Sequence, residues 1–293
     1  MDFPLNKDKL STIFQLNPLK LTKQLESFQD EDTQWTTTYR VVQPNYVFGI
    51  EVEVEKIINN LLVPKHKSYW NTVTDGSLRN HGIEFVSLPL KAFQVEKALK
   101  QVQYQLQNNT PEFSERTSVH VHMNIRDLTL DQILALTLVY TCVEPLLFKW
   151  VGHNRNKNTF CIPLNNTNFY DLYKDITRNP TNTPRMWMKY TAFNLIPISS
   201  KGTVEFRHMY GTLEIDKLIT WINLLSYLKL YVKQHTLKEI TGTIQFLNTN
   251  SFYTEFVSDI FKSYSKELLS NTDNLQQDLE SAITYCKLAS IVE

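Results

Sequence analysis

The stretch "YVFGIEVEVEK", residues 46–56, alternates apolar and acidic side chains without interruption. The apolar set is Ile50, Val52 and Val54, and the acidic set is Glu51, Glu53 and Glu55. Because strand side chains point to opposite faces with a period of two, this stretch predicts a half-buried β-strand. Three carboxylates then share one face. Solvent would explain them, and so would a divalent metal ion.

Three further stretches repeat this arrangement of one apolar and one polar face. They are "GIEFVS" at 82–87, "SVHVHMN" at 118–124 and "TVEFRH" at 203–208. The ionisable residues on the polar faces of these four strands include no lysine; they are Glu51, Glu53, Glu55, Glu84, His120, His122, Glu205 and Arg207. One wet face of an antiparallel sheet is the simpler interpretation. However, like charges that face each other across strands destabilise a sheet, so a cation among them is favoured. Carboxylate oxygens suit Mg²⁺ or Mn²⁺, and imidazole tilts the preference slightly toward Mn²⁺.

Composition limits the class of protein. The 293 residues have 42% hydrophobic content and thirty basic residues against thirty acidic ones, which indicates a folded chain with no general attraction for nucleic acid or an anionic membrane. The three cysteines match no disulfide or CxxC pattern, and no signal peptide is evident, so we expect a cytoplasmic location. The longest apolar run, 133–143, stops at Glu144-Pro145. It is shorter than the ~18 residues of a membrane span and predicts a buried helix.

Strands separated by helices without regular βαβ spacing favour an α+β fold. The expected strands are residues 46–54, 68–73, 82–87, 118–124, 190–197 and 203–210. We expect an N-terminal arm over 1–44 with one helix near 10–28, a catalytic domain over 45–234, and a helical C-terminal extension over 235–293 packed on that domain. The segment 153–184 carries eight asparagines and no long apolar period, which predicts a long ordered or semi-mobile loop. Loops of that length are usually functional or disordered.

The motifs and their order resemble the amidoligase family of bacteria and phages, within the glutamine synthetase and glutamate–cysteine ligase superfamily. The resemblance rests on the stretches "FGIEVEVE", "TDGSL" with "GIEFVSLPL", "SVHVHMN", "KYTAFNL" and "GTVEFRHMYGT". This resemblance spans about residues 46–221. It implies an antiparallel sheet that forms a trough with helices behind it, and an ATP-dependent carboxylate–amine ligase. ATP would phosphorylate a small-molecule or peptide carboxylate, and an amine would displace phosphate from the acyl phosphate.

By position, the resemblance implies that Glu51, Glu53, Glu84 and Glu205 hold two or more Mg²⁺ or Mn²⁺ ions. His120 or His122 would contact metal or a nucleotide phosphate, and the sequence does not choose between them. Arg207 would contact the γ-phosphate. Phosphoryl transfer asks a protein mainly for positioning and charge neutralisation, which metals and an arginine provide. No GxxxxGK[ST] stretch occurs, so a P-loop is excluded.

Further candidate residues lie in or near the asparagine-rich segment. Arg155 is a candidate for binding phosphate or the substrate carboxylate, with solvation as the alternative. Lys189 and Asn194, within "KYTAFNL", are candidates for lining the trough near the nucleotide, and a structural role is equally open for Asn194.

Three other functions remain open from the sequence. The pair His120-x-His122 with one carboxylate would suit a mononuclear iron oxygenase, although the glutamate strands would then be unused. A metal-dependent phosphate-ester hydrolase would act without ATP and an amine. A non-catalytic scaffold derived from a ligase is the third. We expect no nucleic-acid or membrane partner, and the substrates and oligomeric state are not fixed by the sequence.

Overall fold

The computed structural model describes residues 8–26, 35–65, 67–249 and 251–291. It is a mixed α and β structure with an antiparallel sheet, as expected. The chain divides into two compact units: residues 17–124 with 205–226, and residues 1–16 with 125–204 and 227–293. The division into arm, catalytic domain and C-terminal extension stays a prediction, because internal packing alone does not identify a functional domain.

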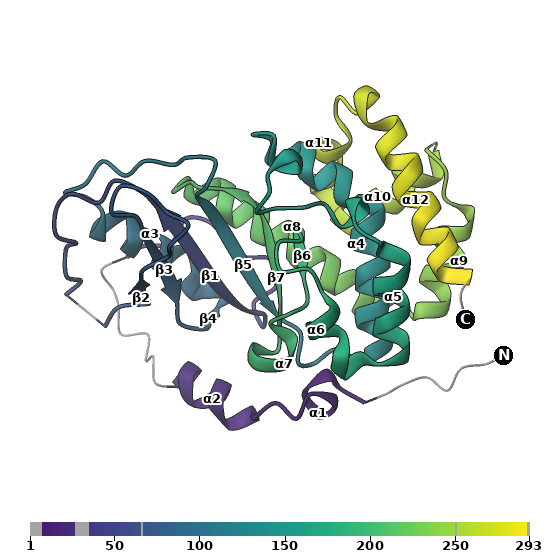
Figure 1. Ribbon diagram of the computed structural model, residues 1–293, viewed down its shortest axis with the longest axis horizontal. Helices are drawn as coiled ribbons and strands as arrows, with labels where there is room; N and C mark the ends of the chain where they lie inside the picture. Colours follow the sequence, from purple (N-terminus) through teal and green to yellow (C-terminus); the bar gives the residue numbers. More distant parts are fainter. Residues whose placement is uncertain (1–7, 27–34, 66, 250, 292–293) are drawn as a thin grey trace. The chain divides into compact units, whose positions relative to one another are not determined.

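The first unit contains the strands that carry the charged residues (Figure 1). Their order is β2–β3–β1–β5–β7, and β4 also pairs with β1. The bounds are β1 Val47–Val54, β2 Trp70–Val73, β3 Ile83–Ser87, β4 Leu90–Lys91, β5 Ser118–Asn124 and β7 Thr203–Tyr210. β1 is antiparallel to both β3 and β5, so it lies between the histidine strand and the strand of Glu84.

One face of these strands is apolar and closed to solvent. Val52, Phe85, Val119 and Val121 are completely buried, which accounts for the period of two in the sequence. Helix α3, Val95–Gln105, holds the edge of the sheet. Its carbonyl at Ala98 accepts the Trp70 indole N–H at 2.7 Å, and the Gln101 side chain accepts the Tyr69 amide at 2.7 Å. The polar face is left for the charged groups.

The N-terminal region differs from the single helix expected over 10–28. Two short helices form instead, α1 Leu10–Ile13 and α2 Pro18–Glu26, and part of the expected helix lies outside the described residues. The chain after them is anchored to the first unit by a buried carboxylate. Glu96 accepts the amides of Thr38 and Tyr39 at 2.8 Å, and Asn223 accepts the Val42 amide at 2.8 Å.

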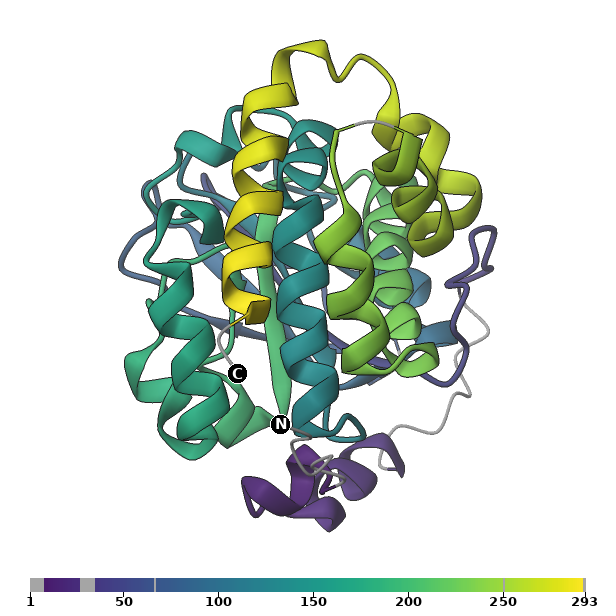
Figure 2. The same cartoon turned by 90° about the vertical axis from the view of Figure 1, so that its right-hand side faces the viewer.

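The second unit is helical and is built around α4, Leu130–Val151 (Figure 2, teal). Helix α12, Gln276–Ile291 (yellow), runs beside it, and α5, α9 and α11 also pack on α4. The other bounds are α5 Phe169–Arg178, α6 Thr183–Met186, α7 Ile198–Lys201, α9 Leu237–Phe246, α10 Ser251–Phe261 and α11 Ser265–Leu269. Helix α8, Ile215–Gln234, continues from the first unit into this one.

Helix α4 is the buried helix expected from the apolar run 133–143, and it is longer than that run. It continues to Val151, because the carbonyl left free by the missing Pro145 N–H is satisfied from outside the helix. Asn165 donates its side-chain amide to the Thr141 oxygen at 3.3 Å. The helix is long and apolar enough to cross a membrane, but 83% of its most apolar window is buried inside the protein, so its composition fits a core helix equally well.

The segment 153–184 has more regular structure than the loop expected. It contains α5, whose Phe169, Leu172, Tyr173 and Ile176 are buried at helical spacing, and several single helical turns. The strand expected over 190–197 shrinks to β6, Phe193–Asn194. Asn194 ends it, because its side-chain oxygen accepts the Ile196 amide at 2.9 Å and turns the chain.

Candidate metal-binding site

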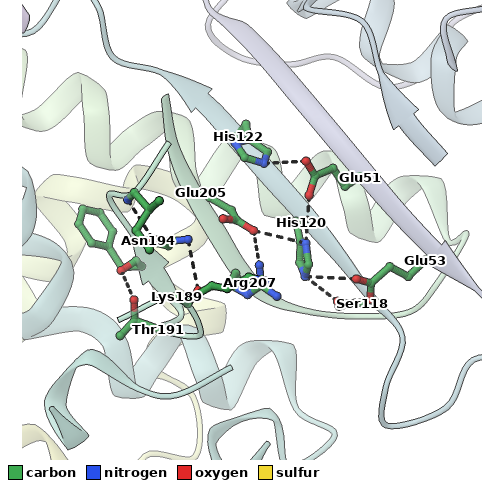
Figure 3. Close-up of polar contacts among 12 residues, drawn as sticks. Glu51, Glu53, Ser118, His120, His122, Lys189, Thr191, Asn194, Glu205 and Arg207 are labelled. Carbon is green, nitrogen blue, oxygen red and sulfur yellow. Dashed lines mark hydrogen bonds and ion pairs between the residues drawn. The ribbon is translucent and has the colours of Figure 1, made fainter. Parts of the chain in front are cut away.

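Four neighbouring strands of the first unit, β3, β1, β5 and β7, bring the predicted carboxylates and histidines to one place. Figure 3 shows the site residues of β1, β5 and β7. The register places Glu51 of β1 opposite His120 of β5, and Glu53 of β1 opposite Glu84 of β3. Glu205 and Arg207 come from β7, the other neighbour of β5. The pairing of the strands thus assembles the site from four separate stretches of sequence.

The two histidines lie within ion-pair distance of the surrounding carboxylates. His120 Nδ1 lies 3.2 Å from Glu51 Oε2 and 3.4 Å from Glu205 Oε1. His122 Nε2 lies 3.1 Å from Glu51 Oε1, so Glu51 is shared between both rings. The His120 side chain is only 3% exposed, which strengthens these interactions by keeping water away.

Ser118 is a member of this network that the sequence reasoning did not single out. Its hydroxyl donates to Glu53 Oε2 at 2.6 Å and lies 2.6 Å from His120 Nε2. A hydroxyl has one proton, and a carboxylate can only accept it. His120 therefore donates its Nε2–H to Ser118, and its Nδ1 is the nitrogen that faces Glu51 and Glu205. The only signal in the sequence was that Ser118 shares a strand face with both histidines.

The carboxylates differ in charge state because their neighbours differ. Burial raises the pKa of Glu51, but His122 and His120 outweigh it and hold the pKa well below its usual range. Burial likewise raises the pKa of Glu205, yet His120, His122 and Arg207 leave it lowered. For Glu84, burial and the negative charges of Glu51 and Glu53 raise the pKa to about 7. Glu84 is the member of the group that lacks enough positive charge nearby.

His120 shows the complementary shift. Burial and the charge of Arg207 lower the pKa of His120, but Glu53, Glu51 and Glu205 outweigh them and raise it above its usual value. The site therefore gathers protons onto His120 and Glu84 when no other cation is bound. A divalent ion could replace those protons, because carboxylates and imidazole nitrogen bind metals in their deprotonated forms.

Two sets of side chains can each direct three ligand atoms to one point. In the first set, atoms of Glu51, Glu84 and His120 lie within 4.8 Å of one another, and in the second the same holds for Glu51, His122 and Glu205. Each histidine belongs to one set, and Glu51 belongs to both. Among residues 8–26, 35–65, 67–249 and 251–291, no such set combines both histidines with a single carboxylate.

The third glutamate of the opening stretch has a different environment. Glu55 follows the end of β1, where it forms an isolated bridge with Glu112. Its side chain is buried, and Oε1 accepts the backbone amide of Arg79 at 2.8 Å. Glu55 therefore fastens the turn before β3 to the end of β1 and belongs to neither set of ligand atoms. Glu53, which was also predicted to bind metal, belongs to neither set as well, and it contacts the site by accepting the Ser118 hydroxyl.

The remaining predicted residues fall into two groups. Arg207 is ion-paired with Glu205 on the same face of β7. Arg155, Lys189 and Asn194 belong to the helical unit. Arg155 is buried in a single helical turn; Lys189 is exposed, with its ammonium 5.3 Å from the Tyr190 ring centre. Asn194 is buried, and its side chain donates to the Lys189 carbonyl at 3.3 Å (Figure 3). Their predicted roles in binding phosphate, nucleotide or substrate stay predictions.

Comparison with known proteins agrees with the order of these motifs. No curated protein matches the chain. A family model described as "Putative amidoligase enzyme" matches residues 20–228, which include every strand of the site. This match covers more than half of the chain and confirms the resemblance inferred from the sequence: the protein belongs to the amidoligase family.

Proposed function

We propose that the protein is an ATP-dependent carboxylate–amine ligase that uses two or more Mg²⁺ or Mn²⁺ ions on the glutamate face of its sheet. ATP would phosphorylate a small-molecule or peptide carboxylate, and an amine would then displace phosphate to form an amide. The observation that carries the proposal is the shared carboxylate Glu51, which joins two sets of three ligand atoms within 4.8 Å, in a family of amidoligases.

The residues present fit divalent metal ions. Each set offers two carboxylates and one imidazole, which suits Mg²⁺ or Mn²⁺. The raised pKa of Glu84, about 7, supports the same conclusion, since burial and the charges of Glu51 and Glu53 disfavour its ionised form. Bound there, the metal ions would neutralise phosphate oxygens and polarise the transferring phosphoryl group.

Within this proposal the protein's own groups position the reactants. Ser118 fixes the His120 ring so that Nδ1 faces Glu51 and Glu205. Glu205 holds the Arg207 guanidinium, which is a suitable donor for a phosphoryl oxygen because it offers a planar fork of N–H groups. His120 and Glu205 are buried and Arg207 is half-buried, so water competes weakly with a bound phosphate chain.

The alternatives fit these residues less well. A mononuclear iron oxygenase needs two histidines and one carboxylate around an open site, whereas each set in the described residues has one histidine and two carboxylates. A phosphate-ester hydrolase shares the metal chemistry, and only its lack of need for ATP and an amine separates it from a ligase. A scaffold without activity would have no reason to keep the buried Glu51–His120–Ser118–Glu53 network.

Two measurements test the proposal. Calorimetry should show ATP binding much more tightly with Mg²⁺ or Mn²⁺ than with EDTA, and equal affinity in both would contradict metal-bridged binding. A screen for ADP release should then present candidate carboxylates with hydroxylamine in place of the amine, and a hydroxamate product should accompany ADP. Turnover of phosphate monoesters without ATP would instead favour the hydrolase.

A further inference from the structure

A second possible binding site lies in the helical unit and shares no residue with the metal-binding face. It is a pocket of about 490 Å³ between α4, the asparagine-rich segment and the first turns of α12. Pockets for small molecules typically measure roughly 300–1,000 Å³, so this one is large enough for a ligand. Its walls belong to elements that pack on one another in the same unit, since α12 contacts α4 and the turn at Leu164–Asn166.

Three of the four asparagines that line this pocket do not hold the segment together. Asn154, Asn156 and Asn166 line it, and their side chains have no hydrogen-bond partner among the described residues. Elsewhere in the segment the amides serve the local backbone, as where Asn158 accepts the Phe160 amide at 2.8 Å. The asparagine-rich segment thus places three side-chain amides at one pocket that make no hydrogen bond within the part of the chain that the structure describes.

The floor of the pocket is fixed. Glu144 accepts hydrogen bonds from the Tyr140 hydroxyl and the Leu164 backbone amide at 2.6 Å. It also accepts the backbone amide and the side-chain amide of Asn165, each at 2.8 Å. Its two oxygens are therefore already engaged by four donors. Glu144 and Asn165 shape the pocket, and other groups must bind the ligand.

Two opposite charges line the same pocket. Lys149 donates to the Leu268 carbonyl at 3.4 Å, and burial lowers its pKa. Asp278 lies in the first turn of α12 and is exposed at the rim. Phe148 and Leu275 add apolar surface to the same lining. The lining thus offers a site for an anion, a site for a cation and amide groups that both donate and accept hydrogen bonds.

We propose that this pocket binds a short peptide with free ends. Lys149 would contact the terminal carboxylate, Asp278 the terminal ammonium, and the three asparagine amides the peptide groups, which present the same donor and acceptor pattern. A neutral sugar would also use the amides but would leave both charges unused, so the charges favour the peptide. The proposal does not rest on the ligase activity.

Trialanine is a suitable probe, followed by ligand-observed NMR and calorimetry with the full chain. Trialanine should bind, and its N-acetylated and C-amidated forms should each bind roughly tenfold more weakly, as expected when one charged contact is lost. Maltotriose, a neutral probe of three sugar units, should not bind. Absence of trialanine binding, equal binding of the blocked peptides, or preferential binding of maltotriose would each overturn the proposal.

Variants locate the binding. Ser281→Trp fills the pocket from an exposed position on α12 and should abolish trialanine binding, while Gln277→Trp, exposed on the same helix outside the pocket, should leave it unchanged. Lys149→Gln should weaken trialanine roughly tenfold and leave the affinity of trialanine amide unchanged. Binding that survives both Ser281→Trp and Lys149→Gln would place the peptide elsewhere and contradict the proposal. Melting curves check that each variant is folded.

Discussion

The hydroxyl of Ser118 lies 2.6 Å from His120 Nε2 and donates to Glu53 at the same distance. This relationship assigns one proton of the His120 ring to Nε2. Nδ1, which faces Glu51 and Glu205, carries the second proton in the metal-free protein and is the nitrogen that a metal ion would bind. Histidines that bind metals usually have their second nitrogen fixed by such a partner, which orients the ring and tunes its basicity. Ser118 would therefore act on the metal site without touching the metal.

We predict that Ser118→Ala lowers Mn²⁺ affinity roughly 10–100-fold, because the His120 ring loses the partner that orients it. Titration of Mn²⁺ followed by electron paramagnetic resonance measures this directly, without any substrate. Ser87→Ala is the matched control, since Ser87 accepts the Ile50 amide at 2.8 Å in the same sheet but has no histidine partner. Equal Mn²⁺ affinity in both variants would show that Ser118 is only a packing residue.

The glutamates of β1 should separate into two classes. Glu51→Gln and Glu53→Gln should each reduce ligase activity at least ~10²-fold, as expected when a group that stabilises transition-state charge is lost. Glu55→Gln should keep most activity, because a glutamine oxygen can still accept the Arg79 amide. Glutamine preserves shape and removes charge, so packing does not confuse the comparison.

Glu55→Ala provides the complementary test of the same strand. It should lower the free energy of unfolding by about 1–3 kcal/mol, since the carboxylate that accepts the Arg79 amide is removed from a buried position. Chemical denaturation measures the change. If Glu55→Gln proves as damaging to activity as the other two glutamine variants, the assignment of metal ligands along β1 is wrong.

The sheet was predictable because its signal is local. The strands expected at 118–124 and 203–210 have those bounds in the structure, and both are amphipathic with a period of two. That the four polar faces meet could be inferred from charge, since eight ionisable groups without a lysine need a shared explanation. The pairing register, with Glu51 opposite His120, was not available from the sequence because it depends on contacts between distant segments.

Two misses have identifiable physical causes. Helix α5 was missed because the prolines and asparagines around it obscured four buried residues at helical spacing. The length of α4 was not predicted, because the apolar run ends at Glu144-Pro145 and the donor that compensates for the proline, Asn165, lies twenty residues further along the chain. A single sequence gives no signal for such a tertiary hydrogen bond.

Asn165 should accordingly be important for stability. Asn165→Ala removes the side-chain amide that donates to Glu144 and to the Thr141 carbonyl. The loss should cost roughly 1–3 kcal/mol of unfolding free energy. Asn166→Ala, at the exposed neighbouring position, should change stability by less than about 0.5 kcal/mol. Thermal or urea denaturation of the two variants measures the difference, and equal stability would mean that Pro145 is tolerated without Asn165.

The pKa of Glu84 predicts how pH acts on the metal-free protein. In the unfolded chain Glu84 ionises near its ordinary value of 4.5, whereas in the folded chain burial and the neighbouring carboxylates hold the pKa at about 7. Between these two values the folded protein binds a proton at Glu84 that the unfolded chain has released. Raising the pH through this window therefore favours the unfolded state.

Glu84→Gln removes this dependence, because glutamine is neutral at every pH. We predict that, in EDTA, the melting temperature of Glu84→Gln exceeds that of the unmodified protein at pH 8 but not at pH 4.5. The comparison between the two proteins cancels other groups with shifted pKa values, such as Glu144. Saturating Mn²⁺ should reverse the order at pH 8, since the metal binds the ionised carboxylate and stabilises only the protein that has it. If the difference in melting temperature between Glu84→Gln and the unmodified protein depends on neither pH nor Mn²⁺, the neighbouring carboxylates do not raise the pKa of Glu84 and Glu84 is not a metal ligand.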